Sequence, residues 1–571
     1  MNTFDDPSLL RLPMGYDDMG AILDNHFSMV DKSLFIREVL EDKAQIVLIT
    51  RPRRFGKTLG LSLLRYFFSK EVLGRPTERM FDGLKISQYP ELMTHQGKYP
   101  VVSLTFKEIT DEGYPAAYAG IAQIMSNLYD EHRVLLASNT LHTDEKEVFE
   151  AILKQKAPET LLRTALFRLT KYLHRHFDIK PIVLIDEYDT PIQSAYLNGY
   201  YDEMIAFMRY FLGSVLKNNL YLHKAVLTGI LRVAKESLFS GLNNLEVYTL
   251  LRPEYREFFG FTEEEVLDLL KRAHLMAHVS EVKHWYDGYR MWELHVYNPW
   301  SIVHCINRGA VFQPYWVNTS DNALVKQLLG KATPDLKTLL ESLVSGQSIR
   351  VMVDENIVFG DLKTHLDSIW NLLLMSGYLT VVSQRITEEG LIEAELIAPN
   401  MEIRGLYRRQ IQEWFTDPLG AMAYESLLKT LVLGEIEEFE ARLQQCLAET
   451  VSFFDITGKE PERFYHGLVL GLLVGLDKTH RVTSNRESGF GRYDVMIIPK
   501  NTQTHPLGIL IEFKKTRTHA ALPKEARAAL AQIHAKNYAL DLKKSGVSEI
   551  LSLGIAFYKK SLEMRSKRIV V

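Results

Sequence analysis

The sequence contains very few cysteines, because only Cys305 and Cys446 occur among its 571 residues. They lie far apart and have no partner at metal-motif spacing, which argues against a disulfide framework and favours a reducing compartment. The first residues are acidic and lack the apolar core of a signal peptide. We therefore expect a cytoplasmic protein.

The sequence also lacks a long apolar run and a strong net charge. Its most apolar stretch, residues 467–476, is too short to cross a bilayer, so no membrane association is expected. A formal net charge of −4 argues against a uniformly basic nucleic-acid binder, although a local basic groove remains compatible with it. A content of 46% hydrophobic and 24% charged residues is ordinary for a globular protein. The length predicts more than one domain.

Apolar strands separated by long helical segments characterise the first half of the chain. The first strand is followed by a helix over residues 59–68. This alternation predicts an α/β fold with a parallel sheet that is covered on both faces. The four predicted strands span residues 45–50, 101–106, 181–186 and 224–229.

A candidate phosphate-binding loop, Arg51–Thr58, leaves the first of these strands and enters the helix. Such a loop directs backbone N–H groups and the positive helix end at one spot. Lys57 is expected to reach the β- and γ-phosphates of ATP, and Thr58 to hold Mg²⁺. Downstream, Asp186 ends a strand and suits the magnesium shell, while Glu187 is placed to orient or deprotonate the attacking water. Further nucleotide contacts are expected from Arg54, Phe55, Gly56 and Thr228.

Arg51 stands where the usual pattern has its first glycine. Its positive charge, like that of Arg53 and Arg54, would attract phosphates. A bulky side chain would also crowd a loop that must wrap tightly around them. A Gly-Lys-Thr sequence can occur by chance. Here a strand precedes it, a helix follows it and an Asp-Glu strand end lies downstream, so a functional loop is the better explanation.

The chain resembles the bacterial AAA-ATPase-like family, whose members usually carry a C-terminal nuclease-like domain. That family shares the Arg-Pro-Arg-Arg form of the loop, so the resemblance makes Arg51 a family trait. It gives no role for Arg232, for which a phosphate-sensing arginine and a surface ion pair are both open. The resemblance rests on the loop and on residues 30–33, 186–191, 228–232, 239–244, 285–289 and 297–300.

The middle of the chain, from about residue 297 to 454, has a mostly helical pattern. Residues 362–377 predict a helix, and residues 378–382 and 391–397 predict two strands. A winged helix and a helix pair with an added hairpin are both compatible with this order.

A second acidic constellation lies near the C-terminus, on strands predicted over residues 493–498 and 508–514. Asp494 and Glu512 can converge to hold Mg²⁺, and Lys514 projects from the same face as Glu512. This lysine can orient a water molecule or stabilise charge on a phosphate under attack. The pattern resembles the PD-(D/E)xK nuclease motif, with Tyr493 in place of its proline, and a helix over residues 523–540 follows it.

Several polar residues around this constellation keep open roles. Glu462 and His466 share a helix face that can line the metal site, although a solvent-facing Glu462 is the simpler interpretation. Glu487 is an alternative third carboxylate, and Gln532 can face a phosphate backbone. The basic run over residues 559–568 can contact DNA or be a solvated tail.

We therefore predict an α/β protein with an AAA-like P-loop ATPase domain over residues 1–296. A helical connector, possibly a winged helix, spans residues 297–459, and a restriction-endonuclease-like domain spans residues 460–571. The expected function is ATP hydrolysis joined to Mg²⁺-dependent cleavage of nucleic acid, DNA rather than RNA, in a possible homo-oligomer. Two alternatives are a nucleotide-driven switch whose C-terminal domain binds without cleaving, and a nuclease whose P-loop is a relic.

Overall fold

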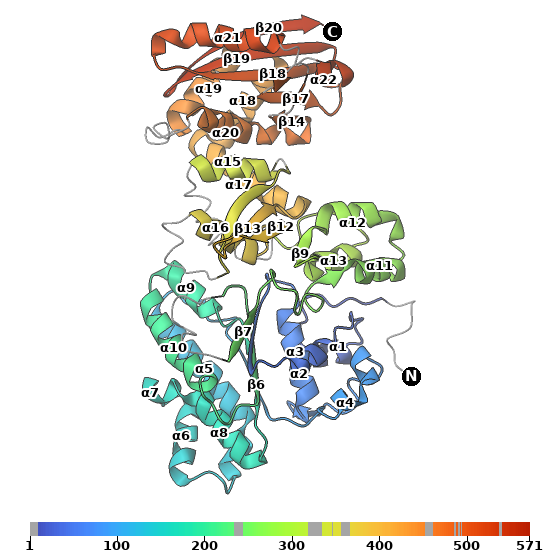
Figure 1. Cartoon of the computed structure of the whole chain (residues 1–571), viewed down its shortest axis with the longest axis vertical. Helices are drawn as coiled ribbons and strands as arrows, with labels where there is room; N and C mark the ends of the chain where they lie inside the picture. Colours follow the sequence, from blue (N-terminus) through green and yellow to red (C-terminus); the bar gives the residue numbers. More distant parts are fainter. Residues whose placement is uncertain are drawn as a thin grey trace. The chain divides into compact units, whose positions relative to one another are not determined.

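A computed structural model describes the protein over residues 10–232, 244–317, 334–344, 346–355, 366–450, 461–484, 487–488, 491–492, 494–535 and 540–570. The chain divides into two compact units. One comprises Met1–Asp321 and Arg350–Glu402, and the other comprises Asn322–Ile349 and Ile403–Val571. A parallel sheet, a largely helical middle and a C-terminal mixed sheet confirm the predicted α/β class (Figure 1).

A five-stranded parallel sheet forms the centre of the first unit, in the order β4-β5-β6-β1-β7. The four predicted strands are confirmed, and most of their residues are buried because both faces of the sheet are covered. The fifth was not predicted, since it is a short, partly exposed edge strand. The strands are β1 (Ile46–Thr50), β4 (Val101–Thr105), β5 (Ile182–Asp186), β6 (Lys224–Gly229) and β7 (Leu245–Tyr248).

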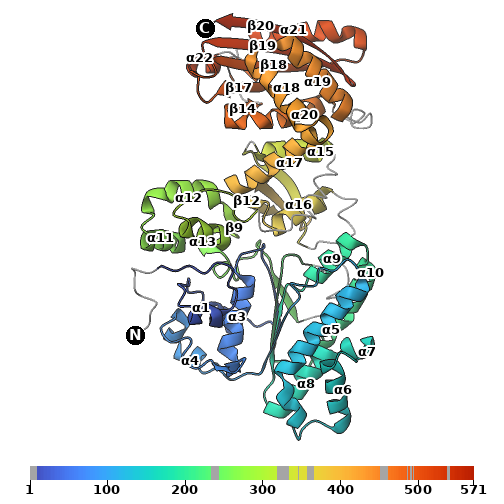
Figure 2. The ribbon, with the colours of Figure 1, turned by 180° about the vertical axis from the view of Figure 1, so that it is seen from behind.

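Helices cover both faces of this sheet, as Figures 1 and 2 show. One face carries α1 (Met19–Asp24), α2 (Phe35–Glu41), α3 (Lys57–Phe68) and α4 (Pro90–Met93). The other face carries α5 (Tyr114–Glu131), α6 (Thr143–Leu153), α7 (Glu159–Leu162), α8 (Ala165–Phe177), α9 (Thr190–Asn198) and α10 (Tyr201–Leu216).

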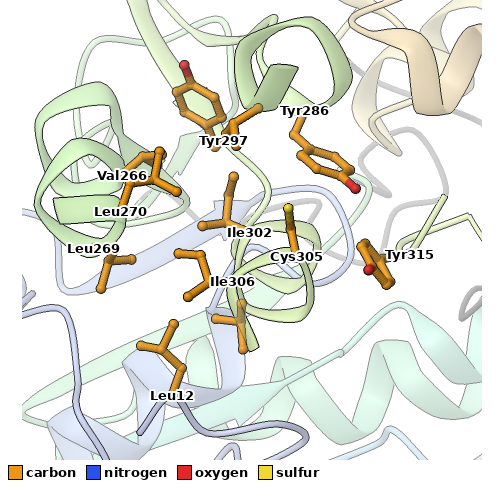
Figure 3. Packing of buried hydrophobic residues seen from close by; sticks show 12 residues of the cluster. Leu12, Val266, Leu269, Leu270, Tyr286, Tyr297, Ile302, Cys305, Ile306 and Tyr315 are labelled. Atoms are coloured by element: carbon orange, nitrogen blue, oxygen red, sulfur yellow. The ribbon is translucent and has the colours of Figure 1, made fainter. Parts of the chain in front are cut away.

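A smaller helical layer follows the sheet within the same unit. It consists of α11 (Glu263–Arg272), α12 (Val279–Tyr286), α13 (Pro299–Asn307) and the strands β8 (Phe261–Thr262), β9 (Tyr289–Met291) and β10 (Leu294–Tyr297). Its core joins side chains of the three helices to Leu12 near the N-terminus, and the thiol of Cys305 is buried there (Figure 3).

The predicted helix–strand–turn–strand order is confirmed by α16 (Leu366–Met375), β12 (Thr380–Ile386) and β13 (Ile392–Ile397). A further strand, β11 (Ile349–Val353), adds to β13 and completes a three-stranded sheet in the order β11-β13-β12. This arrangement is compatible with a winged helix, which stays a prediction.

The second unit packs helices against a mixed sheet in the order β14-β17-β18-β19-β20. Strands β17 and β18 are antiparallel, as the predicted hairpin requires, and β18 is parallel to β19. The helices are α15 (Pro334–Val344), α17 (Met401–Leu419), α18 (Ala421–Leu433), α19 (Ile436–Thr450), α20 (Pro461–Leu473), α21 (Leu522–Ala535) and α22 (Leu540–Lys544). The strands are β14 (His480–Ser484), β17 (Val495–Pro499), β18 (Leu507–Lys515), β19 (Glu549–Tyr558) and β20 (Ser561–Val570).

Of the C-terminal basic residues, Arg565, Lys567 and Arg568 lie in strand β20 and not in a tail, while Lys559 and Lys560 form the turn before it. This strand pairs antiparallel with β19 along its whole length, and Leu562 and Met564 are buried. Helix α19 caps its outer edge, because Glu440 and Gln444 accept hydrogen bonds from the Met564 and Leu562 N–H groups. The charged residues obscured the apolar alternation that marks a strand.

Candidate functional site

The loop between β1 and α3 has the strand–loop–helix form that the sequence predicted. Gly56 directly precedes α3 and has φ = 89°, in the left-handed region that side chains disfavour. The Gly60 N–H donates to the Gly56 carbonyl and starts the helix. A glycine is therefore needed at this position. The loop ends there at the N-terminus of α3, which is the positive end of the helix dipole.

Lys57 lies buried at the start of this helix. Its Nζ donates to the carbonyl oxygens of Arg51 and Pro52, at 3.1 and 3.0 Å. Burial lowers the pKa of Lys57, while the charges of Glu187 and Asp186 act in the opposite direction. The ammonium group is thus held inside the loop, near the carboxylates of Asp186 and Glu187.

Asp186 joins two other predicted site residues. Its two carboxylate oxygens accept hydrogen bonds from Thr58 Oγ1 at 2.7 Å and from Thr228 Oγ1 at 2.6 Å. Burial raises the pKa of Asp186, and the two hydroxyl donors oppose that shift. A carboxylate beside a hydroxyl supplies the hard oxygen ligands that Mg²⁺ prefers, so these residues fit that ion.

Glu187 occupies a strained turn directly after β5. Its φ of 50° lies in the left-handed region, and its side chain accepts a hydrogen bond from Thr190 Oγ1 at 3.1 Å. Thr190 begins α9, so the carboxylate lies near the start of that helix. Asp186 and Glu187 therefore have different hydrogen-bond partners, as two different roles would require.

Asp189 is a buried residue of this region that the sequence did not single out as a site residue. One of its oxygens accepts hydrogen bonds from the Ile230 and Leu231 N–H groups, at 2.9 and 2.8 Å. Burial raises the pKa of Asp189 to about 6. A Cβ on Gly229 would lie 2.5 Å from its other oxygen, which explains the glycine there. Asp189 therefore fixes the exit of β6, just before Arg232.

Arg51 has a different use from the predicted one. Its guanidinium is fully buried and donates to the carbonyl oxygens of Thr50, Tyr248 and Glu254, at 2.9, 2.8 and 3.1 Å. It also lies 5.5 Å from the ring centre of Phe259. Burial lowers its pKa to about 9. Arg51 therefore ties the loop to edge strand β7 and does not turn toward a phosphate position.

Replacing Arg51 with methionine should lower the melting temperature of the nucleotide-free protein by about 5 °C. The substitution keeps an apolar stem but leaves the Tyr248 and Glu254 carbonyls without their donor. Scanning calorimetry with and without ATP measures the effect, and Arg133→Met at an exposed arginine is the control. A loss of stability seen only with ATP would show instead that the guanidinium meets phosphate.

The rest of the loop rests on the following layer of the same unit. The Arg54 guanidinium lies 4.4 Å from the ring centre of Trp300, and the buried Phe55 ring meets Tyr289 edge-on at 5.0 Å. Trp316 Nε1 donates to the Arg53 carbonyl at 3.1 Å. Trp300 and Tyr289 belong to motifs that the resemblance named at residues 285–289 and 297–300. These motifs therefore support the phosphate loop.

Glu402 secures this support. It is buried and accepts hydrogen bonds from Ser301 Oγ at 2.8 Å and from the Trp316 N–H at 2.5 Å. Burial raises the pKa of Glu402 to about 7. Part of one further family motif, residues 239–243, lies outside the described residues.

Asp494 and Glu512 lie opposite each other in the second unit. The antiparallel register pairs Val495 with Ile511, so the next residues along, Asp494 and Glu512, face one another. Asp494 accepts a hydrogen bond from the Phe513 N–H at 2.8 Å. Glu512 is buried and accepts a hydrogen bond from Gln532 Nε2 on α21. Gln532 thus contacts the acidic pair, a placement that the sequence left open.

Lys514 lies two residues beyond Glu512 on the same strand and is partly buried. The opposite face of β18 is apolar as predicted, because Ile509, Ile511 and Phe513 are buried. Gly554 pairs with Glu512 from β19, and a Cβ there would lie 2.4 Å from the Ala526 carbonyl of α21. The glycine lets α21 approach the acidic pair closely.

Two facing carboxylates supply oxygen ligands that fit Mg²⁺. In the part of the chain that is described, no cluster of three or more His, Cys, Asp or Glu side chains is arranged for a metal ion. Glu462 and Glu487 were predicted as possible third carboxylates of the metal site, and this prediction is not tested. Glu462 lies in α20 and Glu487 in β15 (Glu487–Ser488), with both side chains outside the described set.

Comparison with known proteins identifies two regions of the chain. A family described as predicted AAA-ATPases matches residues 13–239, and the PD-(D/E)XK nuclease superfamily matches residues 460–567. Both confirm the resemblance inferred from the motifs. An uncharacterized protein from the vnfD 5′ region of Azotobacter chroococcum mcd 1 is 26% identical over 433 residues, which cover 74% of each chain. Among the described helices, none combines the length and apolarity needed to span a bilayer.

Proposed function

We propose that this chain, which joins an AAA-ATPase-like domain to a PD-(D/E)XK nuclease superfamily domain, hydrolyses ATP and cleaves nucleic acid. DNA is the expected substrate, and Mg²⁺ the expected ion at both sites. The hydrogen bonds that bring Thr58 and Thr228 onto Asp186 carry the ATPase part of the proposal. We assign the ATPase to residues 1–296, a connector to 297–459 and the nuclease to 460–571.

At the first site, each residue has a distinct task. Lys57 balances phosphate charge, and the loop through Arg54, Phe55 and Gly56 offers its backbone N–H groups. Thr58 and Asp186 hold Mg²⁺, which would neutralise charge on the phosphates when bound. Glu187 positions the attacking water and takes its proton. Thr228 senses the γ-phosphate from the end of the neighbouring strand.

At the second site, Asp494 and Glu512 hold the metal ion, which would polarise the scissile phosphate when bound. Gln532 fixes the carboxylate of Glu512 through its hydrogen bond. Lys514 projects from the same strand face and orients the attacking water or balances charge on the phosphate. The buried strand gives these groups a rigid base, as catalysis requires.

A nucleotide-driven switch is the alternative function. In that case the ATPase forms a homo-oligomer whose assembly state changes with the bound nucleotide, and the C-terminal domain binds without cleaving. The chemistry of the ATPase site would then be unchanged, while Lys514 would have no catalytic task. Cleavage of single- and double-stranded DNA, measured with ATP and Mg²⁺, separates the two functions.

Replacing Glu187 with glutamine should lower ATP turnover by about 10²-fold or more and leave ATP binding intact. The amide keeps the size of the side chain but cannot accept a proton from water. Phosphate release at saturating ATP, together with calorimetric ATP affinity, measures both effects. Glu203→Gln at an exposed position is the control. Unchanged turnover would move the catalytic task to another residue, with Asp189 next.

A further inference from the structure

A basic segment of the second unit follows Glu512 directly along the chain. Residues 514–527 contain five lysines or arginines and one glutamate, whereas the whole chain has a net charge of −4. Within this segment, exposed cations extend from the end of β18 to the second turn of α21. They are Lys515, Arg517, Lys524 and Arg527.

The fold gathers this segment at one end of the sheet. Parallel pairing sets Lys515 beside Phe557, and the Thr516 N–H donates to the Phe557 carbonyl at 3.0 Å. The first turns of α21 pack on the end of β19, where Leu522 and Ala526 contact Ala556. The segment therefore folds back over the ends of β18 and β19.

Lys515 lies close to Glu512 along strand β18. Lys515 follows Glu512 by three residues on an extended strand, which corresponds to about 10 Å. None of Lys515, Arg517 and Lys524 forms an ion pair with a carboxylate of the described residues. Cations that no protein carboxylate balances attract a polyanion next to the site.

We propose that the exposed cations Lys515, Arg517 and Lys524 form a track for the nucleic-acid backbone that leads strands to Asp494 and Glu512. This inference rests on the proposed nuclease function and specifies how its substrate is held. Of the two aromatic residues that end β19, Phe557 is buried and Tyr558 is only partly exposed. A track of cations binds phosphates and not base faces, so binding is independent of sequence.

The salt dependence of binding tests the track. Each phosphate contact contributes about −0.9 to the slope of log affinity against log salt for a duplex and about −0.7 for a single strand. The double variant Lys515→Ala/Lys524→Ala should therefore reduce the slope by about 2 for duplex DNA of any sequence. Its affinity should fall by about tenfold or more at low salt, and the loss should shrink as salt rises.

The full chain is titrated in EDTA against fluorescent single-stranded and duplex DNA of unrelated sequences, with anisotropy as the readout. Lys543→Ala/Lys544→Ala is the matched control, because these exposed lysines lie in α22, which packs at the opposite end of β18 beside Gly508. Equal losses of affinity in both variants, or no loss in the first, would overturn the track, and the proposed nuclease would still stand if the wild type cleaves DNA with Mg²⁺. A wild-type chain that binds neither DNA form would overturn both. Melting temperatures confirm that each variant is folded.

Discussion

Replacing Lys57 with alanine should weaken ATP binding by well over tenfold. Each factor of ten corresponds to about 1.4 kcal/mol, and loss of a desolvated charge that faces phosphate oxygens is expected to exceed that. The ammonium group is buried, and its nitrogen is held by the Arg51 and Pro52 carbonyls.

Calorimetric titration with ATP and Mg²⁺ measures this effect. Lys70→Ala is the control, since Lys70 is exposed just beyond the end of the same helix. The melting temperature of the nucleotide-free variant reports whether the loop still folds. An unchanged ATP affinity in a folded Lys57→Ala protein would refute the phosphate-loop assignment.

Removing either Asp494 or Glu512 should abolish the response of the second unit to divalent ions. Two facing carboxylates repel each other, so an ion between them stabilises the folded chain. Mg²⁺ or Mn²⁺ should raise the melting temperature of the wild type, and Asp494→Ala or Glu512→Ala should eliminate that rise. Calorimetry of the full chain with and without each ion provides the measurement.

Lys514→Ala should behave differently, because an ammonium group does not bind Mg²⁺. The metal-dependent rise in melting temperature should persist, while DNA cleavage falls by about 10²-fold or more. Lys500→Ala at an exposed position is the control. Metal binding with cleavage by the wild type supports the nuclease. Metal binding without cleavage favours the switch. If the melting temperature does not respond to metal, Glu512 and Lys514 are ordinary strand residues with no role in a metal site.

The sequence was sufficient for the parts of the fold that depend on local patterns. Buried strands such as Ile182–Asp186 appear as uninterrupted apolar runs, and the Gly-Lys-Thr at a strand–helix junction locates the loop. The facing of Asp494 and Glu512 follows from the hairpin register. These features need only neighbouring residues or a single short connection.

Features that depend on distant partners could not be predicted. Strand β20 has buried Leu562 and Met564 between charged residues, so its pattern resembles a tail until β19 and α19 are present. The burial of Arg51 could not be predicted, because two of its carbonyl partners, Tyr248 and Glu254, lie far along the chain. Gln532 reaches Glu512 only once α21 packs over the sheet.

The buried guanidinium of Arg51 also has a consequence for folding during translation. Two of its acceptors, the carbonyls of Tyr248 and Glu254, lie 197 and 203 positions later in the chain. During translation, the first residue of the phosphate loop has no complete set of partners until edge strand β7 has emerged and paired with β1. A nascent chain therefore completes the support of this loop only after residue 254 has emerged.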